Sequence, residues 1–172
     1  MSRPPPEEPD LDPQVRLGGP ADAAGAMRTW AAAHEARRGL PVEPEHLRRF
    51  RGHLGKPDAF LVVADDRGRI VGMALGEPAL ADDGAGPRLP GRCHVGAVFV
   101  EPDRWGRGLG GRLIDMLLAE GARRGYSSFQ LWTQADNERA LRLYAGRGFT
   151  RTGRSMVLDD ERLVQLSIER PT

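Results

Sequence analysis

The sequence predicts a mixed α/β fold, in which a mostly antiparallel, twisted central sheet of about seven strands is flanked by about four helices. Three observations carry this prediction. The chain has 172 residues, 40% of them hydrophobic, which suits one compact domain with a single core. Short apolar runs alternate with amphipathic segments of helical period. One strand–helix–strand crossover follows Val100, whereas most other neighbouring strands are joined by short connections.

The N-terminal part begins with a segment that has little to bury. Residues 1–13 are rich in proline and acidic groups, so we expect a disordered tail there and a single domain over residues 14–172. Gln14–Leu17 is a short candidate strand. Gly18-Gly19-Pro20 then leads into an alanine-rich helix to about Glu35, because proline is well tolerated in a first helical turn. A second helix is predicted over Pro44–Leu54, where the apolar residues share one face.

The middle of the chain supplies three strands. Ala59–Ala64 is a continuous apolar run too short for a buried helix, and the turn residues 65–68 separate it from a partner strand, Ile70–Leu75. We expect Glu77–Arg92, rich in proline, glycine and aspartate, to form a loop of the kind that borders a site. His94–Val100 is the third strand.

The C-terminal part alternates helices and strands. Leu109–Arg124 has a broad apolar face and predicts a helix. It is followed by a strand at Phe129–Trp132 and a helix at Asn137–Gly146. Two further strands, 149–157 and 163–169, close the predicted fold.

Composition argues against several classes of protein. The formal net charge of +1 gives no reason to expect nucleic acid or an anionic membrane as a partner. The single cysteine, Cys93, rules out an internal disulfide and argues against a cysteine-based metal site, so no metal is expected. Residues 1–9 lack the apolar stretch of a signal peptide, and no apolar run has the length of a membrane span. These features favour a cytoplasmic protein.

The segment from Val98 to Gly111 carries the clearest chemical signal. A strand leads into a stretch with four glycines in six residues, Gly106–Gly111, which opens a helix. A helix start leaves about four backbone N–H groups unpaired and carries roughly half a positive charge. Glycines allow an anion to approach that backbone closely. We therefore expect a ligand that carries a phosphate or diphosphate.

Three phosphate-binding interpretations compete for this segment. Gly106, Gly108 and Gly111 satisfy the dinucleotide pattern GxGxxG, but the strand that should end in a ribose-binding carboxylate ends in Leu131-Trp132-Thr133. A P-loop is excluded because no Gly-Lys-Ser/Thr follows. The third interpretation is coenzyme A. A tight turn without a ligand also remains open.

Two separated motifs resemble the GNAT N-acetyltransferase superfamily. Val100-Glu101-Pro102 and Gly108-Leu109-Gly110 are similar to its diphosphate motif, with Trp105 standing where the family usually has Gln or Arg. Asn137, Ala140, Leu143-Tyr144 and Gly148-Phe149 are similar to a helix further along the family's sequences. The resemblance covers about residues 15–168, and two motifs at the right separation are more specific than either alone.

The resemblance implies acetyl-CoA as co-substrate and assigns roles to individual residues. Val98, Phe99 and Val100 would pair with the pantetheine arm, and the N–H of Phe99 or Val100 would hold the thioester oxygen. Gly106–Gly111 would hold the diphosphate, with Arg104 or Arg107 near the adenosine phosphates. Asn137 would bind the pantetheine, and Tyr144 would protonate the departing thiolate. The cofactor-binding residues expected in this way are Val98, Phe99, Val100, Arg104, Trp105, Gly106, Arg107, Gly108, Leu109, Gly110, Gly111, Asn137 and Tyr144.

The implied reaction is direct attack of a primary amine, on a small molecule or peptide, on the thioester. Glu101, His94 and Asp136 are candidates for the base that takes the amine proton. Tyr144 could instead be a core aromatic, and Asn137 could serve as a helix N-cap. Two other functions stay open: a non-catalytic acyl-CoA-binding module, and an acetyltransferase acting on RNA or translation, which the near-neutral charge disfavours. A homodimer is compatible with such a domain.

Overall fold

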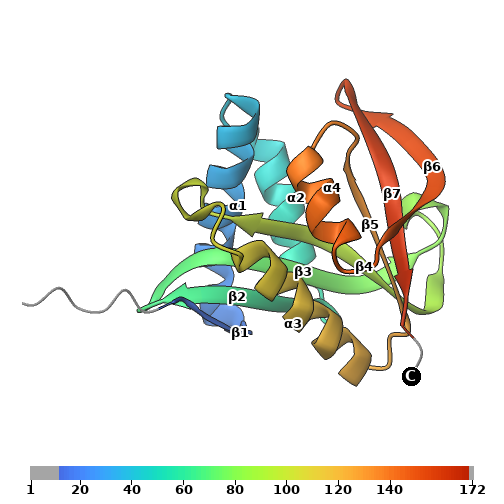
Figure 1. The fold of residues 1–172 in the computed structure, drawn as a ribbon, viewed down its shortest axis with the longest axis horizontal. Helices are drawn as coiled ribbons and strands as arrows, with labels where there is room; N and C mark the ends of the chain where they lie inside the picture. Colours follow the sequence, from blue (N-terminus) through green and yellow to red (C-terminus); the bar gives the residue numbers. More distant parts are fainter. Residues whose placement is uncertain (1–11, 171–172) are drawn as a thin grey trace, which may run out of the picture.

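The computed structural model describes residues 12–170 and contains a seven-stranded sheet with the order β1-β2-β3-β4-β5-β7-β6 (Figure 1). The strands are β1 (Gln14–Leu17), β2 (Phe60–Asp66), β3 (Arg69–Leu80), β4 (Arg88–Val100), β5 (Ser128–Gln134), β6 (Thr150–Leu158) and β7 (Glu161–Glu169). The α-helices are α1 (Ala23–Arg38), α2 (Pro44–Leu54), α3 (Leu109–Arg123) and α4 (Glu138–Ala145). The predicted fold class is confirmed.

Neighbouring strands are antiparallel except β4 and β5, which are parallel and joined by the crossover helix α3. The predicted crossover after Val100 is therefore confirmed. Of the predicted tail, residues 1–11 lie outside the described part of the chain, and Asp12 and Pro13 precede β1 without regular secondary structure. Among residues 12–170, no helix combines the length and the apolar character that a membrane crossing requires.

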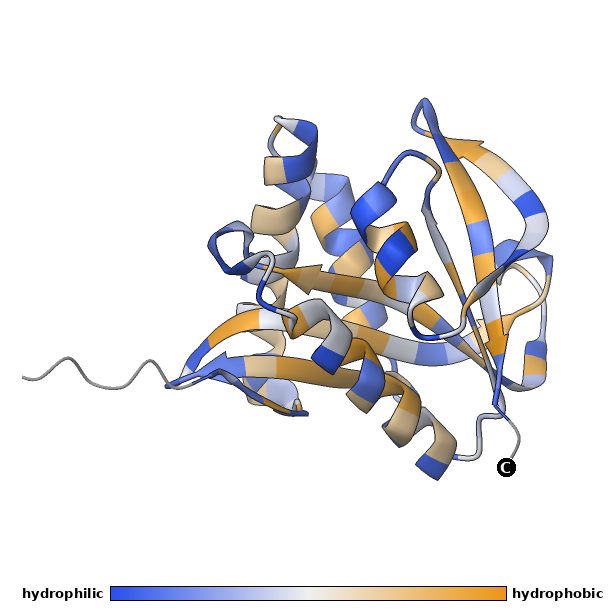
Figure 2. Cartoon of the chain, viewed as in Figure 1, coloured by the Kyte–Doolittle hydropathy of each residue, from blue (hydrophilic) through white to orange (hydrophobic). Residues whose placement is uncertain are grey.

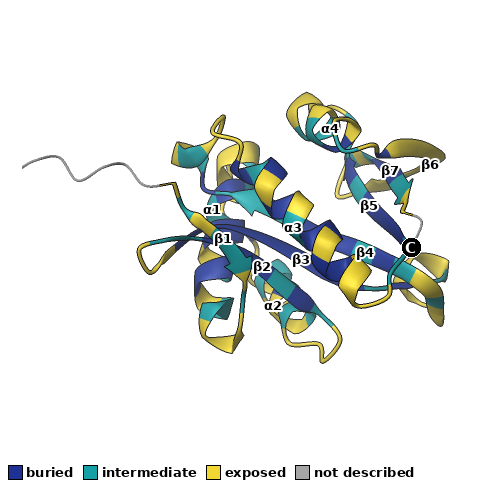
Figure 3. Cartoon of the chain, turned by 60° about the horizontal axis from the view of Figure 1, so that its bottom comes forward, coloured by how far each residue is buried: buried dark blue, intermediate teal, exposed yellow. Residues whose placement is uncertain are grey.

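The sheet separates two groups of buried side chains. On one face, α3 and α4 cover β2–β5 with a cluster that includes Leu113, Leu117 and Phe129, all fully buried. On the other face, α1 and α2 cover β3 and β4 through Trp30 and Phe50, whose rings stack 4.4 Å apart. The apolar strands lie between the helical layers in Figure 2, and Figure 3 shows α3 turning its exposed residues away from the sheet.

The prediction of a loop over Glu77–Arg92 is wrong. β3 continues to Leu80 and β4 begins at Arg88, so only the hairpin tip, including a short 3₁₀ turn at Asp82–Gly84, lies outside the two strands. Proline suggested a loop because it cannot donate to a strand ladder. Here Pro78 lies beside a register shift between Pro78 and Leu80, where an interrupted ladder tolerates it.

Two irregularities of β4 create an opening in the sheet. Leu75 lies opposite Ala97 and Gly76 opposite Val95, so Gly96 is an extra residue that forms a β-bulge. The parallel ladder of β4 with β5 covers only Arg92–His94 against Ser128–Gln130. Beyond these pairs β4 runs on to Val100 and β5 to Gln134, and the two strands diverge in Figures 1 and 3.

Replacing Leu113 with alanine tests the packing of α3 on the sheet. Leu113 is fully buried and lies against Gly72 of β3, so the truncation leaves a cavity that the rigid sheet cannot fill. We expect the free energy of unfolding to fall by about 2–5 kcal/mol in chemical denaturation. Leu158→Ala, at a side chain that is 51% exposed, serves as the control and should change it by less than about 0.5 kcal/mol. Equal effects of the two changes would contradict this description of the core.

Candidate active site

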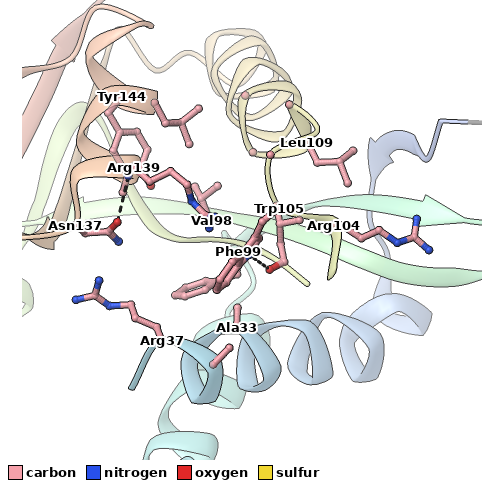
Figure 4. A pocket seen from close by; sticks show the side chains of 18 residues that line it. Ala33, Arg37, Val98, Phe99, Arg104, Trp105, Leu109, Asn137, Arg139 and Tyr144 are labelled. Carbon is pink, nitrogen blue, oxygen red and sulfur yellow. Dashed lines mark hydrogen bonds between the residues drawn. The ribbon is translucent and has the colours of Figure 1, made fainter. Parts of the chain in front are cut away.

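A cavity of about 530 Å³ lies where β4 and β5 separate (Figure 4). Four parts of the chain form its walls: the C-terminal half of α1, the end of β4, the segment that leads into α3, and α4. The lining residues are Ala33, Ala36, Arg37, Val98, Phe99, Val100, Arg104, Trp105, Gly106, Gly108, Leu109, Gly110, Gly111, Asn137, Arg139, Ala140, Leu143 and Tyr144. Its charged side chains are three arginines, and no described Asp, Glu or His lines it.

The end of β4 presents free backbone groups to this cavity. The N–H of Glu101 donates to the Val71 carbonyl at 2.9 Å, and Val100 lies opposite Gly72. Since bonded and non-bonded pairs alternate along an antiparallel ladder, Val98 and Val100 turn their N–H and C=O groups away from β3. Phe99 turns its own toward β3. Of the two residues expected to hold the thioester oxygen, Val100 is therefore the one with an available N–H.

The glycine segment forms an open cradle at the start of α3. Gly106 and Gly108 both have φ of +79°, a left-handed conformation that favours glycine, and a Cβ added at either would meet nothing within 4 Å. The first helical hydrogen bond runs from the Arg112 N–H to the Gly108 carbonyl. The N–H groups of Leu109, Gly110 and Gly111 precede that bond, so the helix leaves them available to an anion.

Basic side chains surround the cradle. Arg104 pairs with Asp66 at 2.6 Å, and this hydrogen bond raises the pKa of the Arg104 guanidinium. The guanidinium of Arg147 fills the space that a side chain on Gly111 would need, and it is held by Asp115 at 3.2 Å. On the opposite wall, Arg37 lies 3.5 Å from Asp136. Each of these three guanidiniums has an aspartate partner, so the attraction for an anion comes mainly from the N–H groups and the dipole of α3.

Trp105 connects the cradle to β4. Its indole Nε1–H donates to the Val100 carbonyl at 2.8 Å, and the guanidinium of Arg139 stacks 4.1 Å from the centre of its ring. An indole has one N–H donor and a large face, whereas the Gln or Arg usual at this position has several donors. Trp105 therefore uses its N–H to fix the loop against the strand and offers its face to α4.

Asn137 and Tyr144 reach the cavity from α4. Asn137 is the N-cap of this helix: its Oδ1 accepts from the Ala140 N–H at 3.2 Å, which confirms the N-cap prediction and leaves the amide NH₂ as the group that can serve a ligand. Tyr144 is 7% exposed and packs edge-to-face on Phe149. Burial raises the pKa of the Tyr144 hydroxyl, so it stays protonated at neutral pH.

The cavity brings together all the expected cofactor-binding residues except Arg107, which does not line it. Two of the expected bases also lie elsewhere. Glu101 is buried and bonded to Arg69 at 2.9 Å. His94 lies half-buried on the face covered by α1 and α2, and burial lowers the pKa of its imidazole. Asp136, the third candidate, has an 88% exposed side chain in the turn before α4.

The sequence alone did not indicate the contribution of α1. Ala33, Ala36 and Arg37 line the cavity although no motif marks them, because they reach it only through the packing of α1 on β3 and β4. Arg139 lines the cavity from the first turn of α4, and helical spacing does not indicate it, because residues two apart on a helix do not share a face. Cys93 is fully buried, and burial raises the pKa of its thiol to about 12, as a packing role requires.

Comparisons with known proteins agree with this geometry. Residues 26–149 match the model of the acetyltransferase (GNAT) family. A mycothiol acetyltransferase of Clavibacter sepedonicus is 33% identical over 128 residues, which are 70% of this chain and 38% of that protein. The chain spans less than half the length of the curated relatives that it matches.

Solved structures share the fold at low identity. The ribosomal-protein-S18-alanine N-acetyltransferase from Escherichia coli superposes with a TM-score of 0.72 at 18% identity, over 92% of this chain and 94% of that one. The structure of yncA from Salmonella typhimurium with its cofactor acetyl-CoA gives a TM-score of 0.70 at 22% identity, over 94% and 96% of the two chains. Because the family model matches well over half of its residues, this chain belongs to the GNAT family of acetyltransferases.

Proposed function

We propose that residues 14–172 form one catalytic domain that transfers an acetyl group from acetyl-CoA to a primary amine of a small molecule or peptide. One observation carries the proposal: a glycine cradle at a helix start and an unpaired strand edge open into the same cavity. The first suits a diphosphate, and the second suits an extended amide-containing arm. Acetyl-CoA has both parts. The acetyl-CoA bound to yncA, a protein of the same fold, supports the choice of ligand.

The cradle fits a diphosphate for two physical reasons. The space above Gly106 and Gly108 is open, so phosphate oxygens can approach the backbone to hydrogen-bond distance. The N–H groups of the first turn of α3 point along the helix dipole, whose positive end stabilises an anion. Arg104 adds positive charge next to the cradle. We assign the adenosine phosphates to this end of the cavity.

The pantetheine arm would then lie along β4 as an added strand. Val98 offers its N–H and C=O, and Val100 its N–H, on the side that faces the cavity, as an extended amide chain requires; the Val100 carbonyl already accepts from Trp105. The amide NH₂ of Asn137 can bind the arm from the other wall. The N–H of Val98, which lies nearer the bulge at Gly96 than that of Val100, would hold the thioester oxygen as negative charge develops on it.

Tyr144 is suited to protonate the departing thiolate. Its ring lines the cavity, and burial keeps its hydroxyl protonated at the pH of the reaction. The hydroxyl can therefore donate its proton to the sulfur as the carbon–sulfur bond breaks, and regain one from the nitrogen that has just attacked. Because the hydroxyl regains a proton as it gives one up, Tyr144 acts as an acid without forming a buried phenolate.

The amine acceptor is to be identified by assay. The relatives named mycothiol acetyltransferases favour a small-molecule acceptor. A thiol-release assay with acetyl-CoA and a panel of alkylamines, amino acids, amino sugars and short peptides tests the proposed function. Release of free CoA with one amine class, together with a product heavier by an acetyl group, is expected. CoA binding without release of thiol by any amine would instead establish a non-catalytic acyl-CoA-binding module.

Changing Gly108 to aspartate tests the diphosphate site. The substitution places a side chain and a negative charge where phosphate oxygens are expected, and we expect calorimetry to detect no CoA binding. Gly125→Asp is the matched control, since Gly125 also has positive φ and open space around it but follows the far end of α3. A folded Gly108→Asp variant with the CoA affinity of the Gly125→Asp control would show that the cradle is not the cofactor site.

Replacing Tyr144 with phenylalanine tests the proton donor. We expect kcat to fall by about 10²- to 10⁴-fold with little change in CoA affinity, because only the hydroxyl is lost. Tyr126, the other tyrosine, stacks on Phe60 and does not line the cavity, so Tyr126→Phe should retain the wild-type kcat. Full activity of Tyr144→Phe across the pH range would remove Tyr144 from this role.

A further inference from the structure

Where β4 leaves β5, the face of the sheet opposite α3 and α4 is also exposed, at Gly96. Cys93, Val95, Val98 and Val100 pack with the α3 cluster, whereas Ala97 and Phe99 pack with the α1–α2 cluster. The bulge at Gly96 produces this change of phase. His94 and Gly96 therefore belong to the α1–α2 side, and Gly96 is exposed there.

Glu77 of β3 is the carboxylate at this point. It lies opposite His94 in the β3–β4 ladder, and its side chain is only 8% exposed. A Cβ added at Gly96 would lie 3.6 Å from the Glu77 Oε1 and 3.9 Å from the His94 Cδ2, so both side chains border the space above the glycine. Because Gly96 is exposed and has no side chain, the Glu77 Oε1 lies close to the surface at this point.

His53 and Lys56 hold Glu77 in place. The His53 Nδ1 lies 3.1 Å from the Glu77 Oε1, and the Lys56 Nζ lies 3.3 Å from the Oε2. Lys56 is the sole lysine in the chain, and its side chain is 46% exposed. Its ammonium shows that the carboxylate accommodates the same group that a primary amine acceptor carries, and an exposed lysine is readily displaced.

The direction of the cofactor places the acetyl group beside Glu77. If the diphosphate lies at the start of α3, next to the Val100 end of β4, an arm that follows β4 runs from Val100 past Val98 toward Gly96. A strand advances about 3.3 Å per residue, so the four residues from Val100 to Gly96 span about 13 Å. The thioester end of the arm therefore comes close to the bulge, and an amine above Gly96 would lie between thioester and carboxylate.

We propose that Glu77 is a catalytic residue that binds the ammonium of the acceptor and takes its first proton, with His53 relaying that proton to solvent. The inference rests on the proposed use of acetyl-CoA. Of the three ammonium protons, one leaves through Glu77 and His53, one departs with the sulfur as thiol by way of Tyr144, and one remains in the amide. The carbon–nitrogen bond forms as the carbon–sulfur bond breaks, so charge and atoms balance.

Glu77 fits this role better than the carboxylate that the sequence indicated. Glu101 is bonded to Arg69 and lies beyond the Val100 end of β4, near the expected diphosphate. The charged or titratable groups that face Glu77 are His53 and Lys56 on its α2 side, His94 beside it on β4, and the Cys93 thiol on the opposite face.

Two amines of similar size and different basicity provide the test. Ethylamine is protonated at neutral pH, whereas the fluorines of 2,2,2-trifluoroethylamine withdraw electrons and leave its amine neutral. For Glu77→Gln we expect kcat/KM to fall by about 10²- to 10⁴-fold with ethylamine and far less with trifluoroethylamine, because the neutral amine needs no first deprotonation. CoA affinity should stay unchanged, since Glu77 does not line the cofactor cavity.

Glu120→Gln is the matched control, because it neutralises an equally buried carboxylate that also has cationic partners, Arg123 and Arg124, but lies near the far end of α3 and does not line the cavity. It should leave both amines unaffected. Glu77→Asp keeps the carboxylate but places it one methylene farther from the amine, so it should also lose activity selectively with ethylamine. It provides the test if Glu77→Gln does not fold. Equal losses with the two amines, or none, in a folded Glu77 variant would overturn the inference alone. Absence of thiol release by the wild type with every amine would overturn the proposed function as well.

Discussion

The structure depends on the shortness of one parallel ladder. β4 and β5 pair over three residues and then separate, so the sheet has an internal edge whose backbone groups have no strand to bond. Buried backbone groups without partners are costly, and a stable fold must either cover such an edge or fill it with a ligand. The bulge at Gly96 helps to open the edge, and α4 closes its far side without bonding to β4. The cavity is the space that results.

Electrostatics divide this space into two ends. At the Val100 end, the N–H groups and the dipole of α3 attract an anion, and no described carboxylate lines the wall. At the Gly96 end, the carboxylate of Glu77 borders the space above the glycine on the α1–α2 side of the sheet. An anionic cofactor and a cationic amine would thus enter from different sides and meet where the strands part. The sheet separates the group that attracts the anionic cofactor from the carboxylate that attracts the amine.

The substitution of Trp105 relative to the family pattern shows how main-chain recognition tolerates change. Trp105 replaces a Gln or Arg and still donates one hydrogen bond to the end of β4, so the loop keeps its position while the rest of the side chain stacks on Arg139. Main-chain groups would bind the cofactor at one end of the cavity, whereas side chains would bind the acceptor at the other. Substitutions can therefore change the acceptor site more easily than the cofactor site.

The sequence by itself determined the order of helices and strands, the crossover, and the glycine cradle, because these depend on local periodicity and on φ values that glycine adopts readily. Helix Pro44–Leu54 has the predicted bounds, and most other elements differ from prediction by a few residues. Only the tertiary structure decided where β4 leaves β5, that α1 supplies a wall, and that Glu77 lies beside Gly96. Those facts arise from register and packing between segments far apart in the chain. A bulge shifts every later side chain to the other face, and no local pattern records where it falls.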